Sequence, residues 1–141
     1  MNRFFTAIIF CFAFFQSTGQ NQVTVQVENF KNNEGVCQAC IFQNASAFEQ
    51  MKAMQCITAL IKDKRSLLIF SGVPNGSYAI FVFHDRNNNQ KMDKNFLGIP
   101  KEGYGASSNK LPFASAPKFS ENKFYLSNQA SLKLNIRLRN M

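Results

Sequence analysis

The sequence predicts an all-β fold: a β-sandwich of about seven antiparallel strands with one long loop. Apolar and polar residues alternate at residues 23–28 and again at residues 132–139, and this period of two is typical of strands with one buried face. Turn residues separate several further short apolar segments, and no segment has the length and apolar spacing of a long helix. These patterns favour two packed sheets.

The first 19 residues have the features of a secretory signal peptide. Arg3 is the only early charge, an apolar run covers residues 4–15, and the small residues Ser17 and Gly19 follow at the positions that a signal peptidase reads. The run is shorter than the roughly 20 residues that span a bilayer. We therefore expect cleavage after Gly19, export to the periplasm or beyond, and one domain over residues 20–141 without a membrane span.

The first half of the mature chain is predicted to form two hairpins with a short helix between them. The segment KNNEG at residues 31–35 supplies the first turn, and Asp63-Lys64 supplies the second. Residues 55–62 alternate in the manner of a strand that is buried on both faces. The predicted elements are strands at 23–28 and 35–42, a helical segment within 44–54, and strands at 55–62 and 66–70.

The second half is predicted to contain the central strand, a long loop and two more strands. The turn residues Pro74-Asn75-Gly76 lead into the most apolar segment, residues 78–83, which suits a strand buried on both faces. Residues 84–119 are polar and rich in Gly, Pro, Ser and Asn, which indicates a long loop. Strands are expected at 123–126 and 132–138. The apolar side chains of the loop are expected to pack against the sheet: Phe96, Leu97, Ile99, Tyr104, Leu111, Phe113 and Phe119.

The chain is basic, with 16 Lys and Arg against 8 Asp and Glu. Removal of Arg3 with the signal peptide lowers the formal charge by one, from +8 to +7. A net charge of this kind keeps an exported protein soluble. Because the basic residues are spread thinly along the chain, no nucleic-acid partner is expected.

Three cysteines follow the signal peptide: Cys37, Cys40 and Cys56. In an oxidising compartment two of them can pair and leave one thiol, and the sequence leaves the pairing open. Cys37 and Cys40 have the spacing of a redox motif, yet that chemistry depends on a helix N-terminus beside the first thiol. Because the flanking residues predict a strand, we expect a structural role.

The loop after the central strand has the spacing of a calcium-binding loop. Counted from Asp85, side-chain oxygens stand at positions 1, 3, 5 and 9, and a backbone carbonyl is available at position 7, as in an EF-hand. Glu102 is the acidic residue that can complete the set. The candidate calcium ligands are Asp85, Asn87, Asn89, Lys91, Asp93 and Glu102.

A second interpretation of the same loop is an Asx-rich turn whose side chains cap their own backbone. Gln90 stands where an EF-hand has glycine, and Phe96 stands where it has a bidentate glutamate. Arg86, Lys91 and Lys94 also oppose the binding of a cation. Both interpretations stay open at this stage.

His84 is the only histidine, and it directly precedes Asp85. A nucleophilic hydrolase would need this residue as its base, but no G-x-S-x-G or comparable motif marks a nucleophile. We interpret His84 as a strand-end residue that is hydrogen-bonded to the loop that follows it.

The residues around the loop resemble a known family. The segments that carry the resemblance are GSYAIFVFHDRNNN (76–89), KMD (91–93), LGIPKEGYG (97–105), SSN (107–109) and APKF (116–119). Together they closely resemble the domain of unknown function 2141 family of exported bacterial proteins, over about residues 23–138. The resemblance implies a sandwich akin to transthyretin-like, or prealbumin-like, domains, and it implies no activity. This chain has Asn89-Gln90 where the family usually has Asn-Gly, and its cysteines lie outside the family pattern.

Three functional hypotheses follow. The first is a non-catalytic exported module that binds an envelope or extracellular ligand through residues 84–119, with calcium stabilising the loop. The second is a small periplasmic enzyme, either a hydrolase or a thiol enzyme, that uses His84, Asp85, Glu102 or the cysteines. The third is an envelope-surface protein that its positive charge holds to anionic lipid headgroups.

Overall fold

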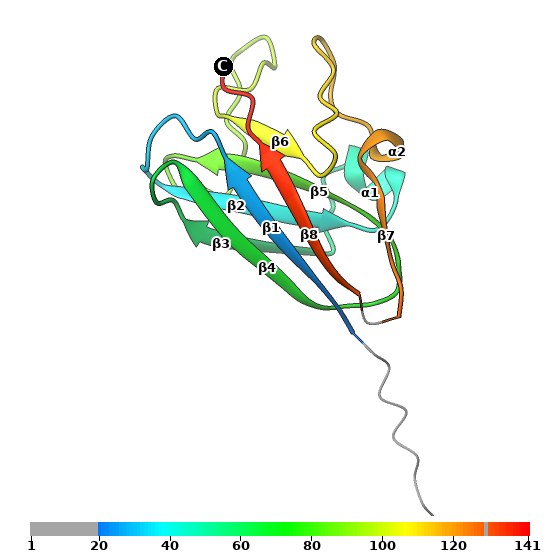
Figure 1. The fold of residues 1–141 in the computed structure, drawn as a ribbon. Helices are drawn as coiled ribbons and strands as arrows, with labels where there is room; N and C mark the ends of the chain where they lie inside the picture. Colours follow the sequence, from blue (N-terminus) through cyan, green and yellow to red (C-terminus); the bar gives the residue numbers. More distant parts are fainter. Residues whose placement is uncertain (1–19, 129) are drawn as a thin grey trace, which may run out of the picture.

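The computed structural model describes residues 20–128 and 130–141, and the predicted signal peptide lies outside them. Two β-sheets pack face to face (Figure 1). The smaller sheet has the strand order β4-β1-β8. Its members are β1 (Asn21–Glu28), β4 (Arg65–Val73) and β8 (Ser131–Arg137).

The larger sheet has five strands in the order β3-β2-β5-β6, and β7 pairs with the first residues of β5. Its members are β2 (Val36–Phe42), β3 (Gln55–Leu60), β5 (Gly76–Asp85), β6 (Tyr104–Ala106) and β7 (Phe124–Leu126). Two short helices, α1 (Ala45–Glu49) and α2 (Phe119–Asn122), lie against the outer face of this sheet. The short helix expected within residues 44–54 is therefore confirmed.

The all-β prediction with two sheets is confirmed, but the strand count and one pairing differ. The described residues form eight strands rather than about seven. The expectation of purely antiparallel strands is wrong for β1 and β8, which pair in parallel from Gln22 beside Ser131 to Glu28 beside Arg137. The reason is that the chain crosses from β7 in the larger sheet to β8 in the smaller one. β8 therefore begins beside the start of β1 and runs in the same direction, because no hairpin turn joins the two strands.

The main core fills the space between the two sheets. Alternate residues of each strand point inward, as the period of two predicts, and they are almost completely buried. Burial of apolar area at about 25 cal/mol per Å² is the main stabilising contribution in such a core. The inward side chains include Val23, Val25 and Val27 of β1, Leu68 and Phe70 of β4, and Ile80 and Val82 of β5.

A second apolar cluster covers the outer face of the larger sheet. The intervening residues of β5, Ala79, Phe81 and Phe83, point outward and are buried beneath α1 and the loop segments. Phe48 of α1 packs edge-on against Phe42 with ring centroids 5.1 Å apart. Because both faces of β5 are buried, the prediction that residues 78–83 form the central strand is confirmed.

Both predicted hairpins are wrong. β1 pairs with β4 and β8, whereas β2 pairs with β3 and β5, so the first connection crosses between the sheets. The Asp63-Lys64 turn does form, but only Lys62 and Arg65 pair across it before β3 and β4 separate into different sheets. Alternation along a strand determines which face is buried and not which strand lies beside it.

Two predictions of burial are also wrong. β3 is an edge strand whose residues are exposed or half-buried, and not buried on both faces. Within the long loop, Tyr104 is buried, and Leu111 and Phe119 pack against the outer cluster. The remaining apolar side chains of the loop are exposed instead of packed against the sheet: Phe96, Leu97, Ile99 and Phe113. No helix in the described parts of the chain is long and apolar enough to cross a membrane.

Candidate functional site

The candidate site is the base of the loop that runs from residue 86 to residue 103, between β5 and β6. Asp85 is the last residue of β5 and is fully buried. Its carboxylate accepts hydrogen bonds from the backbone N–H groups of Asn89, at 3.1 Å, and Gln90, at 2.8 Å. These bonds turn the chain back toward the end of the strand. Gln90 adopts a φ of 62°, the left-handed conformation that glycine would adopt without strain.

Glu102 approaches the same base from the other end of the loop. Its side chain is buried, and its two carboxylate oxygens accept from different parts of the loop. Oε1 accepts from the backbone N–H of Arg86 at 3.1 Å, and Oε2 accepts from that of Asp93 at 3.1 Å. Glu102 therefore joins the beginning of the loop to its middle, which is the position that the sequence suggested for it.

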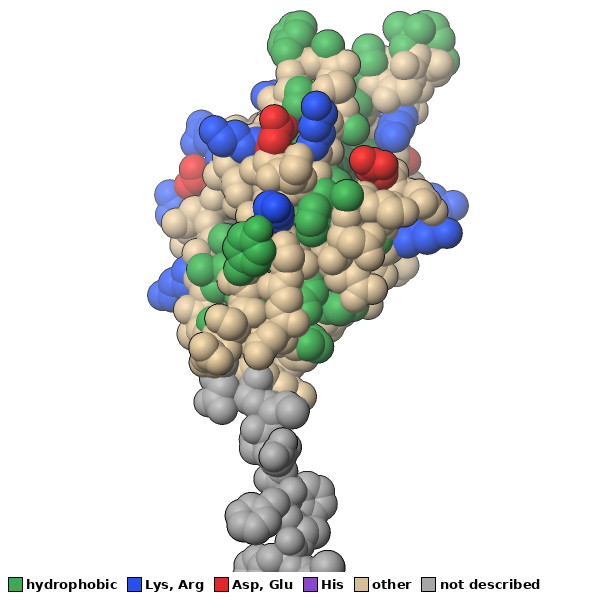
Figure 2. Space-filling view, turned by 90° about the vertical axis from the view of Figure 1, so that its right-hand side faces the viewer, with side chains coloured by type: hydrophobic (Ala, Val, Ile, Leu, Met, Phe, Trp, Pro, Cys, Tyr) green, Lys and Arg blue, Asp and Glu red, His purple; other side chains and the backbone are tan. Residues whose placement is uncertain are grey.

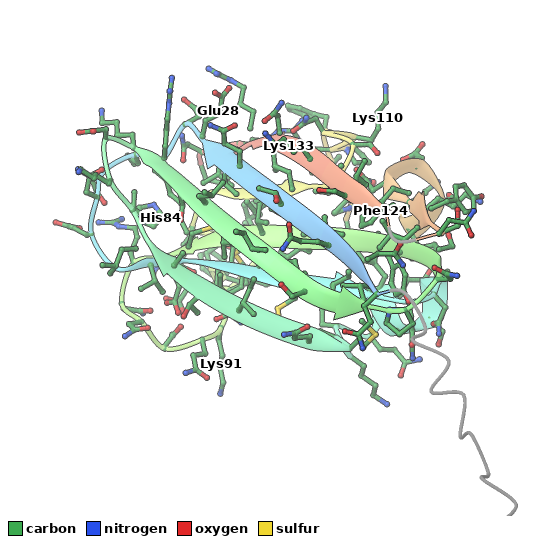
Figure 3. The ribbon with its side chains drawn as sticks, turned by 60° about the horizontal axis from the view of Figure 1, so that its bottom comes forward. Glu28, His84, Lys91, Lys110, Phe124 and Lys133 are labelled. Atoms are coloured by element: carbon green, nitrogen blue, oxygen red, sulfur yellow. A yellow bond between two sulfur atoms is a disulfide. The ribbon has the colours of Figure 1, made fainter. Side chains whose placement is uncertain are left out.

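The two asparagines of the predicted ligand set contact Asp93. The side-chain N–H group of Asn87 donates to Oδ2 of Asp93 at 2.7 Å, and that of Asn89 donates to Oδ1 at 2.9 Å. Oδ1 of Asn89 accepts from the backbone N–H of Lys91 at 3.0 Å. The side chain of Lys91 points away from the sheets (Figure 3). Three of the six predicted residues, Asn87, Asn89 and Asp93, thus meet through their side chains. The carboxylates of Asp85 and Glu102 bond to the backbone of the same loop, and Lys91 joins through its own backbone N–H.

The network is acidic at its centre and has no cationic side chain within it. The ion pairs found among the described residues are Arg86 with Glu34, at 3.5 Å, and Arg137 with Glu28, at 3.1 Å, and neither includes Asp85, Asp93 or Glu102. The two buried carboxylates accept hydrogen bonds from backbone N–H groups. In residues 20–128 and 130–141 no group of three or more His, Cys, Asp and Glu side chains is arranged to hold a metal ion. A cation bound here would need amide and carbonyl oxygens as well.

His84 directly precedes Asp85 in β5 and lies in the interior of the molecule. Its ring is buried (Figure 3), and it packs edge-on against Phe30 with centroids 5.2 Å apart. Nε2 lies 2.7 Å from the carbonyl oxygen of Glu34, which can only accept, so Nε2 carries the proton. Nδ1 is buried without a partner. The ring of the histidine therefore contacts the connection between β1 and β2. The expected bond to the loop after it is made by the backbone instead, because the N–H of His84 donates to the carbonyl of Gly103 at 2.8 Å.

The backbone explains why this connection approaches so closely. Gly35 has a φ of 67°, and a Cβ at this position would overlap the backbone of Asp85 and Arg86. Glycine is therefore required for the connection to pass over the end of β5. This contact holds the carbonyl of Glu34 over His84.

The cysteines have the structural role that was expected. Cys40 and Cys56 stand opposite each other on β2 and β3 and form a disulfide, with Cα atoms 4.1 Å apart. Cys37 is the free cysteine of the described residues and is buried in the main core. Burial raises its pKa to about 12. At neutral pH it is therefore a protonated thiol and lacks the character of a nucleophile.

Two shallow depressions on the surface lie away from these groups. The larger, of about 450 Å³, is lined by residues that include Lys31, Lys64 and Arg65, and the smaller lies between β1, β4 and β8. Neither is lined by His84, Asp85, Glu102 or a cysteine. These candidate catalytic residues thus do not face either depression.

Comparison with known proteins places the chain in a family. Residues 25–133 match the model of a family described as "uncharacterized protein conserved in bacteria", domain of unknown function 2141. The chain belongs to this family. No curated protein and no solved structure matches it. The matched residues include the whole of the loop at 86–103 and at least part of every strand, so the acidic network lies within the matched region.

The site also has a feature that sequence reasoning missed. Phe96, Leu97 and Phe113 were assigned to packing, but they stand in solvent at the tips of two loops. Each tip lies between two lysines, at 94 and 101 in one loop and at 110 and 118 in the other. This spacing alone would not have identified the exposed tips, because residues 102–107 also lie between two lysines, Lys101 and Lys110, and are buried.

Proposed function

We propose that this protein is an exported, non-catalytic binding module, and that calcium stabilises the loop at residues 86–103. The observation that carries the proposal is the pair of buried carboxylates, Asp85 and Glu102, at the two ends of the loop. Neither has a cationic side chain as a partner. Backbone N–H groups satisfy the hydrogen bonding of both carboxylates, but no side chain supplies a counter-charge, and a bound cation would supply one.

The side chains around these carboxylates match the ligands that calcium prefers. Calcium takes six to eight oxygen ligands from carboxylates, amides and carbonyls. Asp93 adds a third carboxylate, and Asn87 and Asn89 now direct their N–H groups at it. Rotation of each amide about its last side-chain bond would present a carbonyl oxygen to an ion, and the backbone would not have to move.

The affinity should be weak. Affinity for calcium follows the charge of the ligands, and Arg86, Lys91 and Lys94 are all exposed around the same loop. We expect a dissociation constant of about 10⁻⁴ to 10⁻³ M, as in extracellular modules. Such a site would be filled outside the cytoplasm, where calcium is abundant.

Two observations support export and a binding role. A disulfide between β2 and β3 suits an oxidising compartment, as the signal peptide predicts. The groups on which an enzyme would depend, His84 and Cys37, are buried within the sandwich. The exposed polar and apolar side chains that could bind a ligand lie instead on the loops, which are the usual place for binding surfaces on a rigid sheet scaffold.

Thermal unfolding with calcium and with chelator tests the calcium site. Calcium at a hundred times its dissociation constant should add about 2.7 kcal/mol to the free energy of unfolding, because it binds only the native state. Asp93→Asn should remove most of this effect, since it deletes a half-exposed ligand charge and keeps the shape of the side chain. Glu121→Gln is the matched control, because it removes one exposed carboxylate from α2, outside the loop.

The proposal of a calcium site fails if the unfolding curves with calcium and with chelator coincide up to about 100 mM calcium, which is a hundred times the weakest dissociation constant expected. It also fails if Asp93→Asn and Glu121→Gln respond to calcium equally. In the second case the effect would come from general screening of charge and not from this loop.

A further inference from the structure

Two loops project from one end of the sandwich and present apolar side chains to solvent. The loop at residues 86–103 and the loop at residues 107–118 both extend beyond the sheets at the top of Figure 1. Figure 2 shows hydrophobic side chains gathered at two separate tips at that end, with Lys and Arg side chains and a few Asp and Glu side chains below them. The exposed fractions are 95% for Phe96, 68% for Leu97 and 101% for Phe113. Such exposure of large apolar side chains on several loops at one end marks an interaction site.

The first tip is held in shape by its own hydrogen bonds. Oδ1 of Asn95 accepts from the backbone N–H groups of Leu97, at 2.9 Å, and Ile99, at 3.0 Å. Gly98 closes the turn with a φ of 77°. Below the turn, Lys101 donates its backbone N–H to the carbonyl of Asp93 at 2.8 Å. The tip is therefore an ordered turn that keeps Phe96 and Leu97 outside.

The second tip is held at its base by Asn122, which is fully buried. The side-chain N–H group of Asn122 donates to the carbonyls of Lys110, at 3.0 Å, and Lys118, at 3.1 Å. Its Oδ1 accepts from the backbone N–H of Lys110 at 3.2 Å. Arg139 also donates to the carbonyl of Pro112, the residue before Phe113, at 2.8 Å. One asparagine thus joins both ends of the loop, and Phe113 lies between them.

Each tip has a lysine on either side of it. Lys94 and Lys101 flank the first tip, Lys110 and Lys118 flank the second, and all four are exposed. No acidic residue occurs between residues 103 and 120. Lys91 and Lys110 extend from separate loops and away from the sheets (Figure 3). This end of the molecule therefore has two exposed apolar tips, each flanked by positively charged lysines.

We propose that this end docks on an anionic lipid bilayer, with both tips inserted at the level of the headgroups. Aromatic and aliphatic side chains bury at this level, to a depth of about 5–10 Å for interfacial segments. The lysine stems run along the apolar surface while their ammonium groups reach lipid phosphates. The complementary charge selects an anionic surface. A fluid lipid surface suits two narrow, separated tips, because lipid molecules can pack around each of them.

This inference deepens the proposed function, because it names the partner of the proposed binding module. The acidic network lies at the base of the first loop and fixes the direction of its tip through Glu102 and Asp93. Calcium at that network would stiffen the loop and reduce the entropy lost on docking. Docking itself depends on the tips and the lysines, so it can be tested separately from the calcium site.

The chain contains no tryptophan, so a single introduced tryptophan reports on one position. Phe113→Trp places the probe at the second tip, and Leu60→Trp places it on β3, where the side chain is 80% exposed and outside the two loops. With vesicles of phosphatidylcholine and phosphatidylglycerol, emission from the probe at position 113 should shift to the blue and be quenched by brominated lipid. Emission from the probe at position 60 should not change.

Vesicle sedimentation measures the affinity. Phe96→Ser together with Phe113→Ser should reduce binding at least about a hundredfold, since each change removes a side chain whose burial is worth more than about 1.4 kcal/mol, which is tenfold in affinity. Lys110→Gln should reduce it about fivefold, as for one lysine near an anionic surface. Lys133→Gln on the outer face of β8 and Leu60→Ser on β3 are the matched controls and should leave binding unchanged.

Docking on lipid is refuted if the emission of the Phe113→Trp variant is insensitive to anionic vesicles, or if neutral phosphatidylcholine vesicles bind the protein equally. It is also refuted if the two controls lose as much affinity as the tip variants, since binding would then depend on overall charge or hydrophobicity. Binding that is equal in calcium and in chelator shows that docking does not require calcium, and the calcium site is then judged by thermal unfolding alone. If calcium stabilises the protein against thermal unfolding but the protein does not bind vesicles, the lipid inference is refuted and the calcium site stands.

Discussion

The two sheets and the two loops are stabilised by different kinds of contact. In the sheets, alternate side chains are buried against one another, and the core between the sheets is almost entirely aliphatic and aromatic. In the loops, the backbone is held by the polar side chains of Asp85, Asn95, Glu102 and Asn122, while Phe96 and Phe113 face solvent. Because polar side chains hold the tips of the loops in shape, the apolar side chains at the tips, Phe96 and Phe113, remain free to bind.

The largest effect on stability is expected from a large-to-small change in the sheets. Phe70→Ala should lower the free energy of unfolding by about 3–5 kcal/mol, because the side chain is fully buried between the sheets and a cavity would remain. Ile69→Ala is the matched control, since Ile69 is the neighbouring residue and its side chain is half exposed on the other face of β4. Urea unfolding measures both. Equal losses would contradict the assignment of the core face.

The disulfide should come second. Replacing Cys40 and Cys56 with serine opens a loop with a sequence separation of 16 and should cost about 3 kcal/mol. The comparison is between the oxidised protein and the double variant in urea, with Cys37→Ala in both to prevent exchange. A double variant as stable as the parent would show that the bond between β2 and β3 adds nothing to the sheet.

Loss of the clamp below the second tip should have a smaller effect. Asn122→Ala removes a buried side chain that makes four hydrogen bonds to the backbone of the loop. It should cost about 1–3 kcal/mol, because buried backbone groups lose their partners. Amide hydrogen exchange should become faster at Lys110 and stay unchanged in β5. Ser120→Ala, an exposed change in the same helix, should alter neither, and exchange that is unchanged in Asn122→Ala would rule out the clamp.

The same contrast explains how much could be predicted from the sequence. The period of two found β1 and β8 with their buried faces, because burial of alternate residues is a local property of the chain. It missed β6, which was assigned to the loop, and the exposure of β3. The pairing of strands was missed, because it depends on which elements meet in three dimensions. The expected transthyretin-like relationship stays a prediction.

The candidate site was predicted in part for a similar reason. The spacing of Asp85, Asn87, Asn89 and Asp93 along one loop brought them together, and Glu102 joined them. The burial of His84 under Glu34 could not be foreseen, since it follows from the crossing of the β1–β2 connection over β5. The exposed tips were missed because apolar residues were assumed to pack.

The most direct test of the whole account measures stability and lipid binding on one variant. Phe96→Ser combined with Phe113→Ser removes two side chains that make no part of either apolar cluster. We predict that its free energy of unfolding stays within about 0.5 kcal/mol of the parent, while its binding to anionic vesicles is lost. A variant that unfolds more easily, or that binds vesicles as the parent does, would contradict the claim that the sheets stabilise and the tips bind.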